Sequence, residues 1–432
     1  MIETFLTTNG FSILQAIFVL IGFLLPIPLA YIAYKLWHHY RQENFISGME
    51  WVLLEIQVPR EVQKTPAAME LVLTNAFYHQ SFKGFWEEFI MGAPWMWFSL
   101  EMVSIDGKVH FFVRTPSRIR DLVETQIYAQ YPQAKVIEAE DYTMKVPQYS
   151  KDGDWHMWGC EFKKLLDDVR PVKTWNKMEA MKIGTKEELK VDPLTSTIEF
   201  LGSLKKGQQM WVQIIVRQSI RTFKGPMSGK KLQFNEYAEE YLKDMLRPYT
   251  KVGKGTRYGG GDVMEVRAPT FIDPYVKAIV ETVQQVHFDC GIRLIVLANK
   301  QYMSEYDFGN FRRASRLIFR QYAAPNLNEF NRINSAQFDS PWSDPTGLAL
   351  TALKKRMLNF YRARMFFHPP IQYGFKYPKL ISAFFPSGKP EIFVMSVAEL
   401  ATIFHFPGRV SETPTFQRIE SKIAKPPTDL PT

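Results

Sequence analysis

Two groups of basic residues in the second half of the chain have the spacing to bind phosphate. Arg312, Arg313, Arg316 and Arg320 recur at helical spacing within a helix expected over 310–322. Lys354, Lys355 and Arg356 lie in a second helix, expected over Gly347–Phe360. Tyrosine and phenylalanine are interleaved with both groups, which is typical of surfaces that contact a nucleic-acid backbone and stack its bases. The same charges could also face anionic lipid headgroups or form an ordinary solvated surface.

The overall composition bounds the class of protein. The 432 residues carry 53 Lys and Arg against 44 Asp and Glu, a net charge of +9 that allows anionic partners. Hydrophobic residues make up 46% of the chain, which excludes wholesale disorder. The only cysteines, Cys160 and Cys290, are far apart and form no CxxC or Cys/His motif, which excludes a disulfide scaffold and a zinc finger.

Catalytic motifs are missing from the sequence. It contains no GxxxxGK[ST] loop, no GxSxG and no HExxH. The acidic pairs Glu87/Glu88, Asp167/Asp168 and Glu239/Glu240 are adjacent in sequence, so their side chains should point apart and cannot act together as acid and base. We therefore expect no catalytic site, no metal and no cofactor, and a protein that is not an enzyme.

The N-terminal region predicts a membrane anchor. Residues 11–37 are apolar except for Ser12, Gln15 and Lys35, and they exceed the length of about 20 residues that a helix needs to cross a bilayer. Residues 1–10 hold no Lys or Arg, whereas Lys35 lies at the end of the apolar stretch and Arg41 follows it. The positive-inside rule predicts a single-pass protein of the cell inner membrane, with residues 1–10 outside and the bulk of the chain in the cytoplasm.

Residues 51–141 predict a first α+β unit. Strands are expected at 51–58, 95–104, 108–114 and 134–140, with the Asp106-Gly107 turn joining the middle two. Helices are expected to begin at Thr65-Pro66 and at Thr115-Pro116. The order β-α-β-β-α-β is that of a ferredoxin-like unit.

The rest of the chain predicts a second unit of the same kind. Residues 142–205 should connect the two, and residues 206–410 should form a second α+β unit with basic insertions, strands at 210–217 and 291–299, and a helix from Asp273-Pro274. Residues 411–432 should form an extended, Pro-rich tail. The expected fold is thus α+β, with one transmembrane helix and two ferredoxin-like units.

Two short segments carry aromatic residues whose role the sequence leaves open. The insert at 82–94, FKGFWEEFIMGAP, could be a short helix that covers a sheet edge, or a contact with membrane or a partner. Near the C-terminus, Ser396 and Glu399 form a capping box. The string Phe404, His405, Phe406 and Pro407 that follows could pack on its own domain or dock a partner.

Several long segments resemble one family. Residues 51–73 (WVLLEIQVPREVQKTPAAMELVL), 97–142, 192–217 and 396–431 are similar to the membrane-anchored N-terminal region of bacterial type IV secretion and conjugative DNA-transfer ATPases, in the branch found in candidate-phylum bacteria. In fused relatives a tail similar to KPPTDLP leads into a P-loop ATPase, whereas this sequence stops at Thr432.

The resemblance implies an accessory role. We expect a non-enzymatic component of a DNA-translocation machine that anchors or regulates a P-loop ATPase on a separate chain, with a homo-oligomer as a possible assembly. The alternative is a membrane-tethered nucleic-acid-binding protein that acts without an ATPase.

Overall fold

The computed structural model describes residues 20–22, 24–59, 64–78, 84–180, 192–253, 263–266, 269, 272–324, 327–337, 344–368 and 390–407. These residues fall into two compact units. Unit 1 includes the N-terminal residues up to Glu50 together with Ser81–Trp95, and unit 2 includes Trp51–Gln80 and Met96–Pro369. Each unit is described separately below.

Unit 1 is built around a long apolar helix. Among the described residues, Leu20–Ser47 is the helix whose length and composition would let it cross a membrane. Its regular part is α2, Pro26–Ser47, which begins with a proline at a position where a missing N–H costs nothing. The first part of the span expected at 11–37, residues 11–19, lies outside the described residues.

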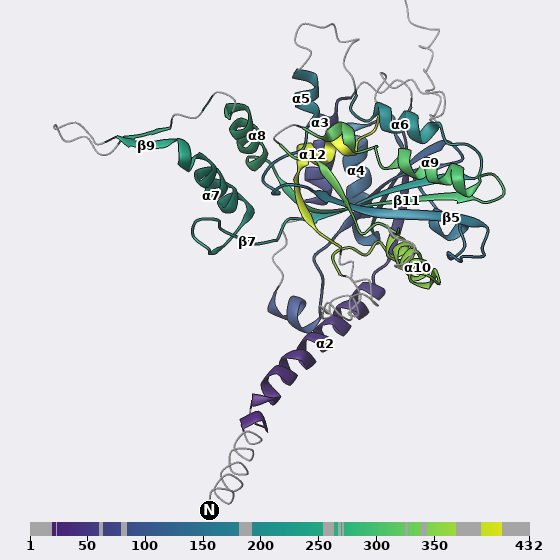
Figure 1. Ribbon diagram of the computed structural model, residues 1–432, viewed down its shortest axis with the longest axis horizontal. Helices are drawn as coiled ribbons and strands as arrows, with labels where there is room; N and C mark the ends of the chain where they lie inside the picture. Colours follow the sequence, from purple (N-terminus) through teal and green to yellow (C-terminus); the bar gives the residue numbers. More distant parts are fainter. Residues whose placement is uncertain are drawn as a thin grey trace, which may run out of the picture. The chain divides into compact units, whose positions relative to one another are not determined.

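Unit 2 combines strands and helices (Figure 1). Its larger sheet contains β1 Trp51–Gln57, β2 Phe98–Ile105, β3 Lys108–Pro116, β4 Lys135–Glu138, β5 Trp155–Lys164, β6 Gln208–Gln218, β11 His287–Asn299, β12 Phe330–Ile333 and β13 Phe393–Ser396. Two small ribbons pair β7 Phe223–Lys224 with β8 Lys231–Leu232, and β9 Thr250–Gly253 with β10 Val263–Val266. The helices are α3 Pro66–Val72, α4 Arg120–Gln130, α5 Trp175–Ala180, α6 Thr195–Gly202, α7 Phe234–Leu246, α8 Asp273–Val283, α9 Glu305–Ser315, α10 Leu348–Ala363 and α12 Val397–Ile403.

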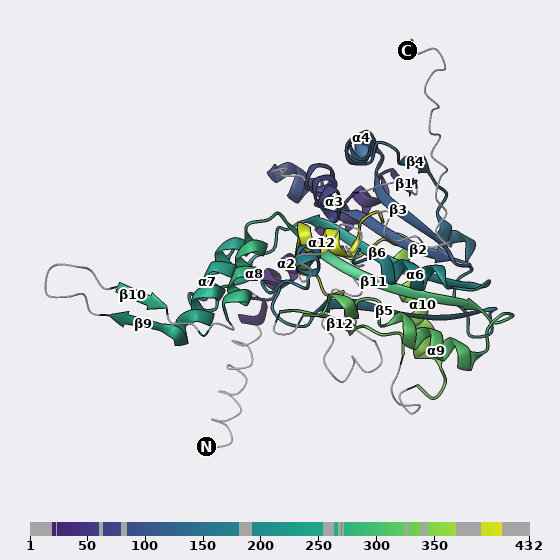
Figure 2. The same ribbon diagram turned by 90° about the horizontal axis from the view of Figure 1, so that it is seen from above.

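The nine strands form one antiparallel sheet in place of the two successive ferredoxin-like units that we expected. Its order is β12-β5-β11-β6-β2-β3-β1-β4, and β13 also pairs with β11 (Figure 2). The segment 142–205, expected to connect the units through shorter elements with possible strands near Trp155 and Trp158, contributes β5 to the sheet. That strand is buried on both faces over Met157–Phe162, so it lacks the polar alternation that identifies a half-exposed strand in a sequence.

Different helices pack on the two faces of the sheet. On one face, helices α3, α4, α6, α9 and α12 pack over strand residues such as Leu100, Ile214 and Leu294. On the other face, α10 packs over Val103, Trp211 and other strand residues. Figure 1 shows α10 on the opposite side of the sheet from α3 and α12.

Local turn chemistry explains where some elements begin and end. Asp106 and Gly107 both have positive φ (53° and 82°), which confirms the predicted tight hairpin. The predicted helix start at Thr115-Pro116 lies slightly too early: Pro116 is the last residue of β3, a 3-10 turn follows over Ser117–Ile119, and α4 begins at Arg120. Pairing of Pro116 with Trp51 on β1 keeps this part of the chain extended.

A row of buried polar side chains crosses the α10 face of the sheet. Glu101 on β2 is the cross-strand partner of Gln213 on β6. Gln213 pairs in turn with Arg293 on β11, and Arg293 pairs with Glu161 on β5. The Gln213 amide donates to Glu101 at 3.1 Å, and Arg293 donates to Gln213 at 3.2 Å and to Glu161 at 2.7 Å. We call these four residues the buried polar row.

Arg364, just after α10, neutralises one end of the buried polar row. Its guanidinium donates to both oxygens of Glu101, at 3.0 and 3.2 Å, and also to Asp141. The hydroxyls of Ser99 and Tyr142 donate to the same Glu101 carboxylate at 2.6 and 2.8 Å. Burial alone would raise the pKa of Glu101, but the Arg364 charge and these donors outweigh it and hold the pKa below the ordinary 4.5.

The Glu101–Arg364 pair predicts a large effect of a nearly isosteric change. Glu101→Gln removes the buried one of the two carboxylates that neutralise the Arg364 guanidinium, so the free energy of unfolding of the purified chain in denaturant should fall by about 3–5 kcal/mol. A lowered folded-state pKa contributes stability above the unfolded pKa, and this contribution is lost as pH falls through the acid range. The difference in free energy of unfolding between the unchanged chain and Glu101→Gln should therefore become smaller below about pH 4.

The matched control is Glu391→Gln, which removes the partner of Lys163 (2.7 Å) in a largely exposed pair. Its effect on unfolding should be far smaller, since water solvates the remaining lysine. Equal effects of the two variants would show that the Glu101 carboxylate is not held as a buried charge.

Candidate phosphate-binding site

Helix α9 places part of the first basic group on the surface. The hydroxyl of Ser304 accepts from the backbone N–H of Asp307 at 3.2 Å and so fixes the start of the helix. Phe308 and Phe311 are buried under the helix, which turns Arg313 outward. The helix ends at Ser315 and not at 322 as expected.

Arg320 lies beyond the end of α9, which carries Arg312 and Arg313 and is followed directly by Arg316. It begins a separate short turn, Arg320–Tyr322, and is exposed. The helical spacing that grouped it with Arg312 and Arg316 is therefore not realised in the fold. Among the described contacts, none joins Arg320 to the other arginines.

The structure instead brings Arg332 to Arg312 and Arg316. Arg332 lies on the edge strand β12, opposite Phe162 of β5, and Phe162 belongs to the core on the α9 side of the sheet. This register directs Arg332 to the face that α9 covers. We call Arg312, Arg316 and Arg332 the arginine cluster.

The three cations of the arginine cluster disfavour one another. Partial burial lowers the pKa of Arg312, and the nearby charges of Arg313 and Arg332 lower it further. Burial also lowers the pKa of Arg316, followed by the charges of Arg332 and Arg312. The carboxylate of Glu305 opposes this effect at Arg312. An anion bound here would relieve the repulsion.

Two contacts hold the guanidinium of Arg316 in place. Its charged end lies 5.1 Å from the ring centre of the buried Trp158, and it donates to Gln337 at 3.0 Å. The Nε atoms of Arg312 and Arg316 are shielded from solvent and have no hydrogen-bond partner among the described residues.

The second basic group contributes one residue to this region. Lys354 is close enough to Arg312 and Lys300 for their charges to lower its pKa, and burial lowers it most, to about 8. Its ammonium donates to the hydroxyl of Tyr149 at 3.2 Å. Lys355 is exposed, and the described contacts do not link it to the arginine cluster. Arg356 is partly buried on the same helix.

Sequence reasoning missed Arg332. It lies in a segment of four residues, Phe330–Ile333, within a region rich in Asn, Ser and Pro that we expected to be irregular. The spacing of residues along one helix cannot identify a residue that a separate strand brings next to that helix. The only local signal was the apolar–polar–polar–apolar string itself, which is too short to identify a strand.

The aromatic string near the C-terminus is buried and cannot be the docking element that we considered. Phe404, His405 and Phe406 are each at most 1% exposed, and Pro407 is buried as well. Phe404 and Phe406 pack edge-on against Phe111 of β3 at 5.9 and 5.7 Å between ring centres. Of the two interpretations, packing on its own domain is the correct one.

His405 is fixed by two acceptors. Its Nδ1 faces the carbonyl of Ala401 at 2.8 Å, and its Nε2 faces the carboxylate of Asp192 at 2.9 Å. These two contacts tie the end of α12 to the start of the chain leading into α6.

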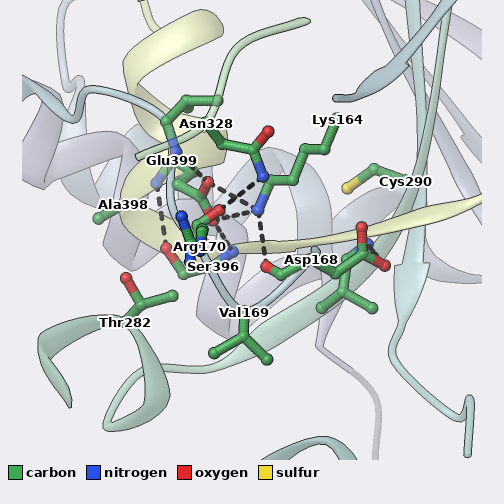
Figure 3. Close-up of polar contacts among 12 residues, drawn as sticks. Lys164, Asp168, Val169, Arg170, Thr282, Cys290, Asn328, Ser396, Ala398 and Glu399 are labelled. Atoms are coloured by element: carbon green, nitrogen blue, oxygen red, sulfur yellow. Dashed lines mark hydrogen bonds and ion pairs between the residues drawn. The ribbon is translucent and has the colours of Figure 1, made fainter. Parts of the chain in front are cut away.

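A buried ion pair anchors the beginning of α12 (Figure 3). The side chains of Lys164 at the end of β5 and Glu399 are both 0% exposed, and Lys164 Nζ lies 2.8 Å from Glu399 Oε1. Glu399 also accepts from the backbone N–H groups of Val172 and Ser396, each at 2.8 Å. The predicted capping box is confirmed, and the fold uses its carboxylate for a second purpose, as the counter-ion of a buried lysine.

Polar groups around this pair are satisfied by the protein itself. Asp168 accepts from Arg221 and from the backbone of Val394, and burial raises its pKa to about 6. Cys290 is fully buried, which raises the pKa of its thiol. Near them, a polar pocket of about 240 Å³ is lined by Lys177, Glu281 and neighbouring residues. Within the described ranges, no group of His, Cys, Asp and Glu is arranged to hold a metal ion.

The shifted pKa of Lys354 offers a direct test of the site's electrostatics. Arg312→Ala removes a repelling cation, so it should raise the pKa of Lys354 from about 8 toward 10.5. Glu305→Gln removes an attracting anion and should lower it. Carbon-13 NMR of the reductively methylated chain, with Lys354→Arg to assign the signal, would follow both titrations. Shifts of the same sign in the two variants would contradict the arrangement.

Neither a protein-family model nor a curated protein matches the sequence. The role of the arginine cluster is therefore inferred from its own geometry and charge.

Proposed function

We propose that this chain is a membrane-tethered, non-enzymatic component of a DNA-transfer machine that binds a nucleic-acid backbone at the arginine cluster. The observation that carries this proposal is the meeting of Arg312, Arg316 and Arg332 on two elements, with Glu305 as the opposing carboxylate at Arg312. Guanidinium groups in this situation favour phosphate, because a planar fork can donate two hydrogen bonds to its oxygens.

Structural roles explain only part of this arrangement. Arg312 and Arg313 occupy the last turn of α9, where cations interact favourably with the helix dipole. That interaction accounts for the basic residues on the helix, but not for Arg332, which the edge strand β12 brings to them. Tyr306 on α9, which is 79% exposed, offers a ring on which a base could stack.

The resemblance to DNA-transfer ATPases is the reason for preferring nucleic acid over other phosphates. A P-loop ATPase on a separate chain is the partner that we propose, and assembly of several copies around it is compatible with this role. Its contact surface must lie elsewhere than Phe404–Pro407, which are buried. If no ATPase takes part, the same cluster fits the alternative of a nucleic-acid-binding protein acting alone.

We also propose that the sheet combines two ferredoxin-like halves joined side by side. Two quartets of strands support this reading, β4-β1-β3-β2 and β12-β5-β11-β6, since each has the order fourth-first-third-second of its own strands. The halves would meet where β2 pairs with β6. In the second half, α7, α8 and the two small ribbons are inserted between β6 and β11.

Salt dependence of oligonucleotide binding tests the function. Replacing Arg312, Arg316 and Arg332 together by Ala should weaken binding and reduce the slope of log K against log salt by about 0.7–0.9 for each phosphate that the variant no longer neutralises. Fluorescence anisotropy with a labelled oligonucleotide, measured on the full chain in detergent across a salt series, gives both quantities.

The control changes the same net charge elsewhere. Lys224, Lys230 and Lys231 are exposed around the β7–β8 ribbon, and their replacement by Ala should leave the slope close to that of the unchanged chain. If both triple variants reduce the slope equally, binding reflects overall charge and the site is not at the arginine cluster.

The orientation of the chain is a separate expectation. Because the basic residues follow the apolar helix, a fluorescent protein fused after Thr432 should mature in the cytoplasm, and alkaline phosphatase fused at the same point should stay inactive. Active phosphatase would place the bulk of the chain outside and would exclude a cytoplasmic role in DNA transfer.

A further inference from the structure

The described part of the 82–94 insert packs on helix α2 within unit 1. The ring of His38 lies 3.0 Å from the carbonyl oxygen of Glu88, and Arg41 Nε donates to the carbonyl of Ile90 at 3.2 Å. The ring of His38 also lies 6.3 Å from that of Phe89. The two hydrogen bonds join side chains of α2 to backbone carbonyls of the insert, so they fix where the insert lies along the helix.

Gly92 brings the two backbones together. Its φ is +71°, and a Cβ atom there would lie 2.8 Å from backbone atoms of Arg41 and Gln42. Only glycine accepts both the left-handed conformation and this close approach. The insert is therefore docked on α2 by a specific geometry and is not a loop that merely passes near it.

The docked insert presents its aromatic residues to the outside. Phe85 and Trp86 are 67% and 68% exposed, Met91 is 52% exposed and Phe89 is 37% exposed. The short helical turn Trp86–Ile90 contains no buried residue. Phe85 contacts the rings of Phe89 and Trp86, at 5.0 and 6.5 Å between centres, so these three rings form one apolar patch. A patch of this kind in water would be costly unless something covers it.

The position of the insert along α2 indicates what surrounds the aromatic patch. The apolar stretch of residues 11–37 is long enough to cross the roughly 30 Å of a hydrocarbon core as a helix, and it ends at Trp37. His38 and Arg41, which hold the insert, follow directly after Trp37. The aromatic patch is thus fixed at the level where α2 would leave the bilayer, which is where Trp and other aromatic side chains are enriched.

We infer that Phe85–Met91 is an interfacial membrane hook, and that Phe85, Trp86, Phe89 and Met91 insert into the boundary between headgroups and acyl chains beside α2. The inference rests on the proposed membrane anchoring by α2. The occupant is lipid, because the patch is continuous with the anchor. Glu87, on the same turn, is exposed and would remain on the water side.

Site-directed spin labelling of the full chain tests the hook. Cys160 and Cys290 are fully buried, so a single introduced cysteine can be labelled selectively. The chain carrying Phe85→Cys or, separately, Trp86→Cys is reconstituted into vesicles of phosphatidylcholine and phosphatidylglycerol. Power saturation of the spin label in the presence of oxygen, and separately of a water-soluble nickel chelate, then measures how deep the label lies in the bilayer. Both labels should collide more with oxygen than with nickel, at a depth of about 5–10 Å below the surface.

Two further labels separate the possible failures. Ile27→Cys, 68% exposed on α2, should report the hydrocarbon core, and Tyr306→Cys, 79% exposed on α9, should report water. A lipid-exposed Ile27 label with water-exposed Phe85 and Trp86 labels would overturn the hook and leave the anchor intact. Water exposure at Ile27 as well would overturn the anchor and the hook together. Labels at Phe85 and Trp86 shielded from both reagents would show protein as the cover and would also overturn the hook.

Discussion

The buried polar row sets the register of the central sheet. Glu101, Gln213, Arg293 and Glu161 lie directly opposite one another on four neighbouring strands, and all are almost completely buried. A shift of one residue in any pairing would turn these groups to the face covered by α3 and α12, where apolar side chains offer no hydrogen bonds. An uncompensated buried charge costs several kcal/mol, so the pairing that keeps the row intact is strongly favoured over its neighbours.

Other parts of the fold depend on that register. The end of α10 must lie over the row so that Arg364 reaches Glu101, and this in turn places Lys354 of the same helix near Arg312. Pairing of β12 with β5 continues the sheet by one strand and turns Arg332 to the α9 side. The arginine cluster is therefore a consequence of sheet geometry, although none of its members belongs to the row.

The C-terminal helix illustrates how a local signal acquires a tertiary role. Ser396 and Glu399 predict a helix start from sequence alone, and α12 begins there. The sequence does not indicate that Glu399 pairs with Lys164, or that Phe404 and Phe406 fill the space over Phe111. Two aromatic residues before a proline look the same in a sequence whether a core or a partner surrounds them.

Local chemistry in the sequence determined the apolar N-terminal helix, the Asp106-Gly107 hairpin, the start of α3 at Thr65-Pro66 and the capping box of α12. These features depend on residues within a few positions of one another, so the sequence records them completely. Tertiary structure alone decided that β5 joins the sheet, that Arg320 is separated from Arg312 and Arg316, and that Arg332 joins them. The physical reason is that strand pairing over more than 100 residues decides which side chains meet, and the spacing of residues along one segment does not contain that information.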